Sequence, residues 1–111
     1  MKTALRVATI GEAATGLALL VLPSFVGQVL FGAPMSDPLT VVAARVAGIA
    51  LLGLCAACWW ESPLLGMLVY GAAITRFLAV VGVMGGLTGV LLWPAVLLHG
   101  ILTAALAMDL R

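Results

Sequence analysis

The sequence predicts an all-α fold, a four-helix transmembrane bundle with a short interfacial helix between its first and second spans. Of the 111 residues, 65% are hydrophobic and 8% are charged, and the mean hydropathy is +1.32. Soluble domains carry about 25% charged residues. Four apolar runs approach the ~20 residues that a spanning helix needs, and none shows the alternation of a membrane β-barrel. We therefore expect a single integral membrane domain over residues 1–111, and no nucleic-acid partner, because no basic run exists.

The first spanning helix is predicted over residues 4–22. Its basic start resembles the positive region of a signal peptide, but Glu12 lies inside the apolar run, so we expect a retained helix. Pro23 ends this helix. Residues 23–32 are too short to span, and their apolar positions have helical spacing, which predicts a short helix in the membrane interface that stops at Gly32.

Cap residues mark the next two helices. Asp37 can cap a helix whose first turn holds Pro38, and this helix is predicted over residues 38–60, closing on Trp59 and Trp60. Such an aromatic pair suits the headgroup level. Glu61-Ser62-Pro63 is a tight turn with the same order of cap and proline, and the third span is predicted over residues 64–84.

The fourth span is predicted over residues 90–110, after the glycine-rich segment 85–89. Trp93 marks its interface, and Pro94 lies in its first turn or begins it. The few basic residues outside the membrane core are Lys2 and Arg6 at one end of the chain and Arg111 at the other. Four spans bring both termini to one side, and the positive-inside rule makes that side cytoplasmic. We expect a multi-pass protein of the bacterial inner membrane.

Away from its ends, each spanning segment holds one charged residue or histidine, in order Glu12, Arg45, Arg76 and His99. A charge at the centre of a membrane helix costs about 2.5–3.5 kcal/mol on insertion scales. At 1.5 Å of rise per residue, these residues lie about 10–15 Å from the extracytoplasmic ends of their helices. We therefore predict that they form one polar layer and line one cavity open toward the outer face.

Two interpretations of this layer remain open. In the structural one, Glu12 pairs with one arginine, the other arginine bonds backbone carbonyls or snorkels, and His99 is a neutral hydrogen bonder. In the functional one, the two arginines exceed the single glutamate, and an anionic or carbonyl-bearing ligand balances them. We expect a non-enzymatic protein without cofactor that binds a quinone, another small ligand or a membrane lipid here, or acts as a subunit of a larger membrane complex or homo-oligomer.

Cys55 and Cys58 form a C-x-x-C motif, the spacing of many redox pairs. The chain resembles vitamin K epoxide reductase and its bacterial disulfide-forming relatives in this motif and in being a small helical membrane protein. Those proteins relay electrons through further cysteines, whereas this chain has only two. The pair also falls near the predicted cytoplasmic end, where thiols stay reduced. We therefore interpret Cys55 and Cys58 as small apolar packing groups. A membrane thiol oxidoreductase that uses both is the alternative. We expect no metal site, because no second cysteine pair or nearby histidine completes one.

In length, helix number and the position of Glu12, the chain is similar to the small multidrug resistance transporters. This likeness implies proton-coupled transport through Glu12, which is the leading alternative function. Two features depart from that family: the two arginines would repel cationic substrates, and the tryptophans lie at helix ends, where they form no cage.

The overall layout resembles the DoxX-like group of small four-helix bacterial membrane proteins. The resemblance rests on the first helix ending at Leu22-Pro23 before the segment that ends in Phe31-Gly32, and on a second helix that holds Ala44-Arg45-Val46-Ala47-Gly48 and closes on Cys58-Trp59-Trp60. Some members are subunits of quinone-linked sulfur oxidation. The resemblance therefore implies an accessory role beside a membrane redox enzyme, and no catalytic residue is carried over.

Overall fold

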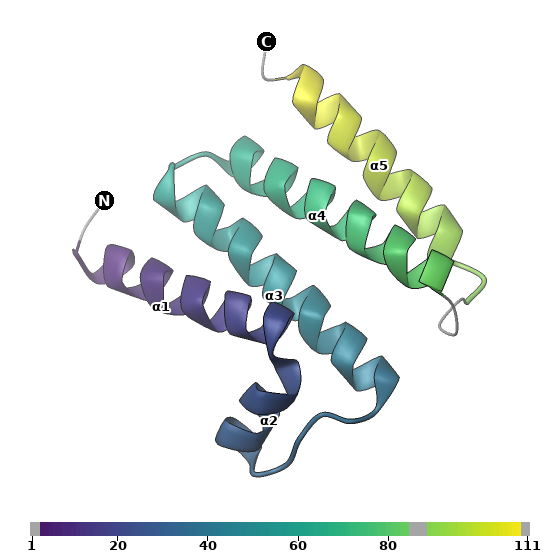
Figure 1. Ribbon diagram of the computed structural model, residues 1–111. Helices are drawn as coiled ribbons and strands as arrows, with labels where there is room; N and C mark the ends of the chain where they lie inside the picture. Colours follow the sequence, from purple (N-terminus) through teal and green to yellow (C-terminus); the bar gives the residue numbers. More distant parts are fainter. Residues whose placement is uncertain (1–2, 85–88, 110–111) are drawn as a thin grey trace.

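The computed structural model describes residues 3–84 and 89–109. These residues form five helices and no strand: α1 (Thr3–Val21), α2 (Pro23–Phe31), α3 (Pro38–Trp59), α4 (Pro63–Met84) and α5 (Leu92–Met108) (Figure 1). The predicted all-α class is confirmed, and the boundaries of α1 to α4 lie within one residue of the prediction. By length and composition, α1, α3 and α4 are apolar enough to cross a membrane.

The four longer helices lie side by side in one layer (Figure 1). α1 packs on α3, α3 on α4 and α4 on α5, and no other pair of these helices brings described Cα atoms within 8 Å. The Cα atoms extend over 38 × 35 × 15 Å, so the layer is about one helix diameter thick. The predicted four-helix transmembrane bundle is therefore not confirmed. The helices form an open row, in which α3 and α4 have a neighbour on each of two sides.

Glycines lie where neighbouring helices meet, at contacts that we call seams, and they explain how closely the helices of the row pack. A Cβ atom on Gly16 of α1 would lie 2.9 Å from the carbonyl oxygen of Gly48 on α3, and one on Gly53 would lie 2.8 Å from Cβ of Tyr70 on α4. At the last seam, a Cβ on Gly82 would meet the Trp93 ring at 2.6 Å. Small residues let helix backbones approach closely where lipid removes the hydrophobic driving force. Gly86, four residues after Gly82 and so spaced as a small-xxx-small pair with it, lies outside the described residues.

The predicted caps are confirmed. Asp37 Oδ2 accepts a hydrogen bond from the Thr40 backbone N–H at 3.1 Å, and Ser62 Oγ accepts one from the Leu65 N–H at 3.1 Å. Between α3 and α4, Glu61 adopts φ 50° and the Ser62 N–H donates to the Ala57 carbonyl at 3.0 Å. This is a Schellman-type helix end with a glutamate where glycine is usual.

α2 and the start of α5 lie at the other end of the layer from the turn between α3 and α4 (Figure 1). α2 ends where Gly32 adopts φ 77° and its N–H donates to the Gln28 carbonyl, which confirms the predicted stop. α5 begins at Leu92 instead of Val90, because Leu91 offers no capping side chain and the Leu92 N–H closes a turn onto the Gly89 carbonyl. Pro94 therefore lies in the first turn of α5.

α5 has 17 residues, and its length of about 26 Å is short of a ~30 Å hydrocarbon core. Three described helices meet the length of a span, and the fourth span stays a prediction.

Candidate functional site

The layer has two broad faces, which the residues of α3 distinguish. At about 100° per residue, Leu52 and Ile49 lie on one side of α3, whereas Leu54 lies about 140° away from Ile49. Cavities lined by Leu52 or Ile49 therefore open on one face, and cavities lined by Leu54 open on the opposite face. We call the first the arginine face and the second the glutamate face, for the reasons given next.

Arg76 lies on α4, is exposed, and lines a cavity of about 370 Å³ on the arginine face. The other residues that line this cavity come from α1, α3 and α4 and are all apolar: Leu20, Ile49, Ala73, Phe77 and Val80. No ion pair with an N–O distance of 4.0 Å or less forms anywhere in residues 3–84 and 89–109. The Arg76 guanidinium therefore has no carboxylate partner among these residues.

Arg45 belongs to the same face. It precedes Ile49 on α3 by four residues, a rotation of only about 40°. Its side chain is half-buried, and its Nε is buried without a hydrogen-bond partner. A buried donor left unsatisfied costs about 1–3 kcal/mol, and more when the group is charged.

Glu12 lies on the opposite face. It is exposed on α1 and lines a smaller cavity of about 150 Å³ together with Leu54, Cys55 and Cys58. Glu12 and Arg76 thus line separate cavities on opposite faces of the layer. The structure does not bring them into one cavity and does not pair Glu12 with an arginine, because an open row has no interior toward which all four residues can point.

His99 sits on α5 at the edge of the row. Its Nδ1 donates to the Ala95 carbonyl at 2.8 Å, since a carbonyl only accepts, and its ring meets Tyr70 edge-on with centroids 6.2 Å apart. Tyr70 lines a cavity with Leu54, which places this contact toward the glutamate face. α3 and α4 separate α5 from α1, so His99 is remote from Glu12. His99 therefore forms a hydrogen bond within its own helix, as the structural interpretation expects of a hydrogen-bonding residue.

The two cysteines are free thiols, Cys55 buried and Cys58 half-buried. The Cys55 Sγ donates to the Thr9 carbonyl across the α1–α3 seam at 3.3 Å. Within the described part of the chain, no group of three or more His, Cys, Asp or Glu residues could hold a metal ion. Cys55 thus fills a seam between two helices, as a small packing group does.

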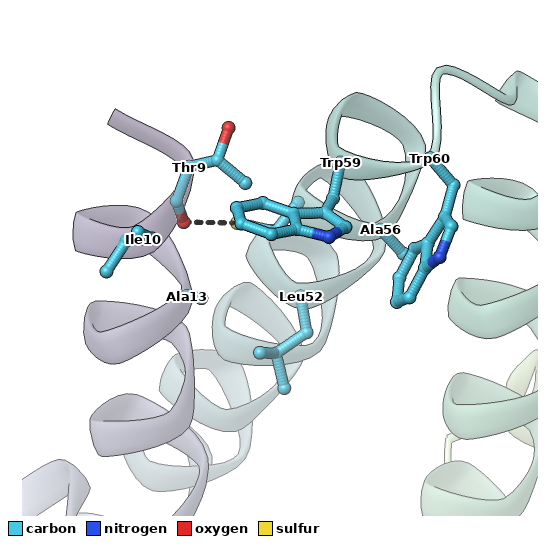
Figure 2. A pocket seen from close by; sticks show the side chains of 8 residues that line it. Thr9, Ile10, Ala13, Leu52, Ala56, Trp59 and Trp60 are labelled. Atoms are coloured by element: carbon cyan, nitrogen blue, oxygen red, sulfur yellow. Dashed lines mark hydrogen bonds between the residues drawn. The ribbon is translucent and has the colours of Figure 1, made fainter. Parts of the chain in front are cut away.

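One further cavity was missed by the sequence reasoning. It measures about 260 Å³, opens on the arginine face between α1 and α3, and is bordered by Trp59 and Trp60 (Figure 2). The Arg6 guanidinium lies 5.6 Å from the centre of the Trp59 ring. The expected antiparallel pairing of the first and second spans could have indicated this cavity, because it brings the start of α1 beside the end of α3.

No protein-family model matches the chain, and the curated proteins and solved structures contain no significant match. The resemblances to DoxX-like proteins and to small multidrug resistance transporters therefore stay predictions.

Proposed function

We propose that this chain is a multi-pass membrane protein that binds an amphiphile on its arginine face, with Arg76 and Arg45 holding an anionic or carbonyl headgroup. One observation carries the proposal. Two arginines lie on the same face beside an apolar cavity, and the glutamate expected to neutralise one of them lines a cavity on the opposite face.

The energetics favour a ligand over an empty site. Each arginine in a bilayer core costs about 2.5–3.5 kcal/mol on insertion scales. An oxygen acceptor on a ligand forms charge-assisted hydrogen bonds with a guanidinium, and these are roughly twice as strong as neutral ones. A carboxylate, a phosphate and a quinone carbonyl all supply such an oxygen. The apolar residues Leu20, Ile49 and Phe77 beside Arg76 suit the hydrophobic part of the same molecule.

The proposed topology has four spans with both termini in the cytoplasm. α1, α3, α4 and α5 alternate in direction, so Thr3 and Met108 share the end of the layer that holds the α3–α4 turn. Arg6 lies at this end, which the positive-inside rule places in the cytoplasm. α2 then lies at the extracytoplasmic boundary, where its exposed apolar residues suit an interfacial helix: Phe25, Val29, Leu30 and Phe31.

Native mass spectrometry of protein extracted from its own membranes tests this function. We expect a bound amphiphile that is lost in Arg76→Gln and in Arg45→Gln and is retained in Glu12→Gln, the matched control on the opposite face. Added oleate and decylubiquinone then distinguish a carboxylate from a carbonyl headgroup. Retention of the amphiphile in both arginine variants would overturn the proposal.

A second candidate function is proton-coupled transport through Glu12. The sequence argument against it was that two arginines would share the cavity and repel a cation. The arginines lie on the other face, so this objection does not apply to the cavity that Glu12 lines. Transport predicts that Glu12→Gln abolishes substrate-driven proton release in proteoliposomes, whereas Arg76→Gln leaves it intact.

A further inference from the structure

We propose that the cavity bordered by Trp59 and Trp60 is a second binding site, which takes an anionic phospholipid. The acyl chain lies in the groove between α1 and α3, and the phosphate contacts Arg6. This site is independent of the one proposed for Arg45 and Arg76.

The groove suits a hydrocarbon chain. Ile10 and Ala13 of α1 line one side, and Leu52 and Ala56 of α3 line the other (Figure 2). At about 260 Å³, it is smaller than the ~300–1,000 Å³ pockets that enclose a drug-sized ligand. A segment of an acyl chain therefore fits it better than a compact molecule.

Arg6 supplies the charge that a phosphate requires. The guanidinium carbon lies over the Trp59 ring, 5.6 Å from its centroid, and such a cation–π contact holds the guanidinium beside the ring while its N–H groups stay available. No carboxylate of the described chain lies within 4.0 Å of it. A planar guanidinium held in this way binds two phosphate oxygens at once.

The indole N–H groups of Trp59 and Trp60 are further hydrogen-bond donors at the depth of Arg6. Their side chains are 41% and 62% exposed for Trp59 and Trp60, and neither indole nitrogen is hydrogen-bonded to the residues drawn in Figure 2. Tryptophan and arginine at helix ends mark the headgroup region. The phosphate of a bilayer lipid therefore lies at the depth of Arg6, while its chain runs inward along the groove. The positive charge selects an anionic headgroup over a zwitterionic one.

Lipid retention in native mass spectrometry tests the site. The full chain is reconstituted in discs of mixed phosphatidylglycerol and phosphatidylcholine, and Arg6→Gln is compared with Arg6→Lys, the control that keeps the positive charge. We expect wild type and Arg6→Lys to retain phosphatidylglycerol preferentially, and Arg6→Gln to lose about tenfold in its retention. Equal retention of the two lipids by wild type, or equal loss in both variants, would overturn the proposal.

Fluorescence quenching provides a second readout that does not depend on Arg6→Gln folding. In a Trp93→Phe variant, emission comes only from Trp59 and Trp60, since the chain has three tryptophans. Phosphatidylglycerol with brominated chains should quench this emission at lower lipid fractions than the corresponding phosphatidylcholine. Identical quenching curves would contradict the site, whereas loss of the amphiphile at Arg76 would leave these curves unchanged.

Discussion

Replacing Gly48 by alanine tests the close backbone contact between α1 and α3. The new Cβ would lie 2.5 Å from the Gly16 carbonyl oxygen, 3.0 Å from the Leu20 nitrogen and 3.1 Å from Cβ of Leu19. Two of these three atoms belong to the backbone of α1, which cannot rotate away as a side chain does. We therefore expect α1 to shift away from α3.

The expected magnitude follows from two opposing terms. Overpacking a close contact costs about 1–3 kcal/mol, while replacing a helical glycine by alanine gains about 0.5–1 kcal/mol. Gly11 provides the matched control, because it lies on α1 with nothing within 4 Å of an added Cβ. Gly11→Ala should gain stability or leave it unchanged, and Gly48→Ala should lose about 1–2 kcal/mol.

Unfolding in mixed micelles with increasing dodecyl sulfate, followed by tryptophan fluorescence, measures both variants under identical conditions. If Gly48→Ala proves as stable as Gly11→Ala, the close approach of α1 to α3 is wrong, and with it the reasoning that glycines set the row.

Three further variants are checked in the same unfolding assay. Glu61→Gly should raise stability by about 0.5–1 kcal/mol, because glycine adopts φ 50° without a Cβ penalty; a similar gain in Glu61→Ala would rule out this cause. Asp37→Ala should lower stability by about 1 kcal/mol by removing the cap on Thr40, and an unchanged midpoint would show that the cap is not needed. Ile74→Ala, at 2% exposure, should cost about 2–5 kcal/mol, whereas Ile101→Ala, at 66% exposure, should cost far less; equal costs would mean that α4 is not buried at this position.

The helix boundaries were predictable because the signals that set them are local. Asp37 and Ser62 cap the helices that the sequence assigned to them, and Gly32 ends α2 in the left-handed conformation. Each depends on a few consecutive residues, so one sequence suffices. The start of α5 was less predictable, because Leu91 carries no capping group and only a turn onto the Gly89 carbonyl fixes the first turn.

The arrangement of the helices was not predicted, although α3 carried a signal. Gly48 and Gly53 are five residues apart, which places them about 140° apart around the helix. They meet α1 and α4 respectively. Glycines that allow close approach on two sides of one helix indicate that this helix lies in the middle of a row.

The sequence predicted that Glu12, Arg45, Arg76 and His99 lie within helices, and each does. Counting residues along a helix gives a position along its axis. Which face a residue occupies depends on the rotation of each helix about that axis, and the contacts between neighbouring helices set this rotation. The sequence alone therefore did not show that Glu12 and Arg76 lie on opposite faces of the layer.

The row also determines the order in which the chain can assemble. Among the described residues, no long helix contacts a long helix other than the one before or after it in the sequence, so an early helix can pack before the later helices are made. Contacts between near neighbours close short loops and form fast. A chain inserted from its N-terminus can complete the α1–α3 seam before α4 emerges, and the α3–α4 seam before α5 does. Stability is then close to a sum over seams, so damage at the α4–α5 seam should leave the α1–α3 pair assembled.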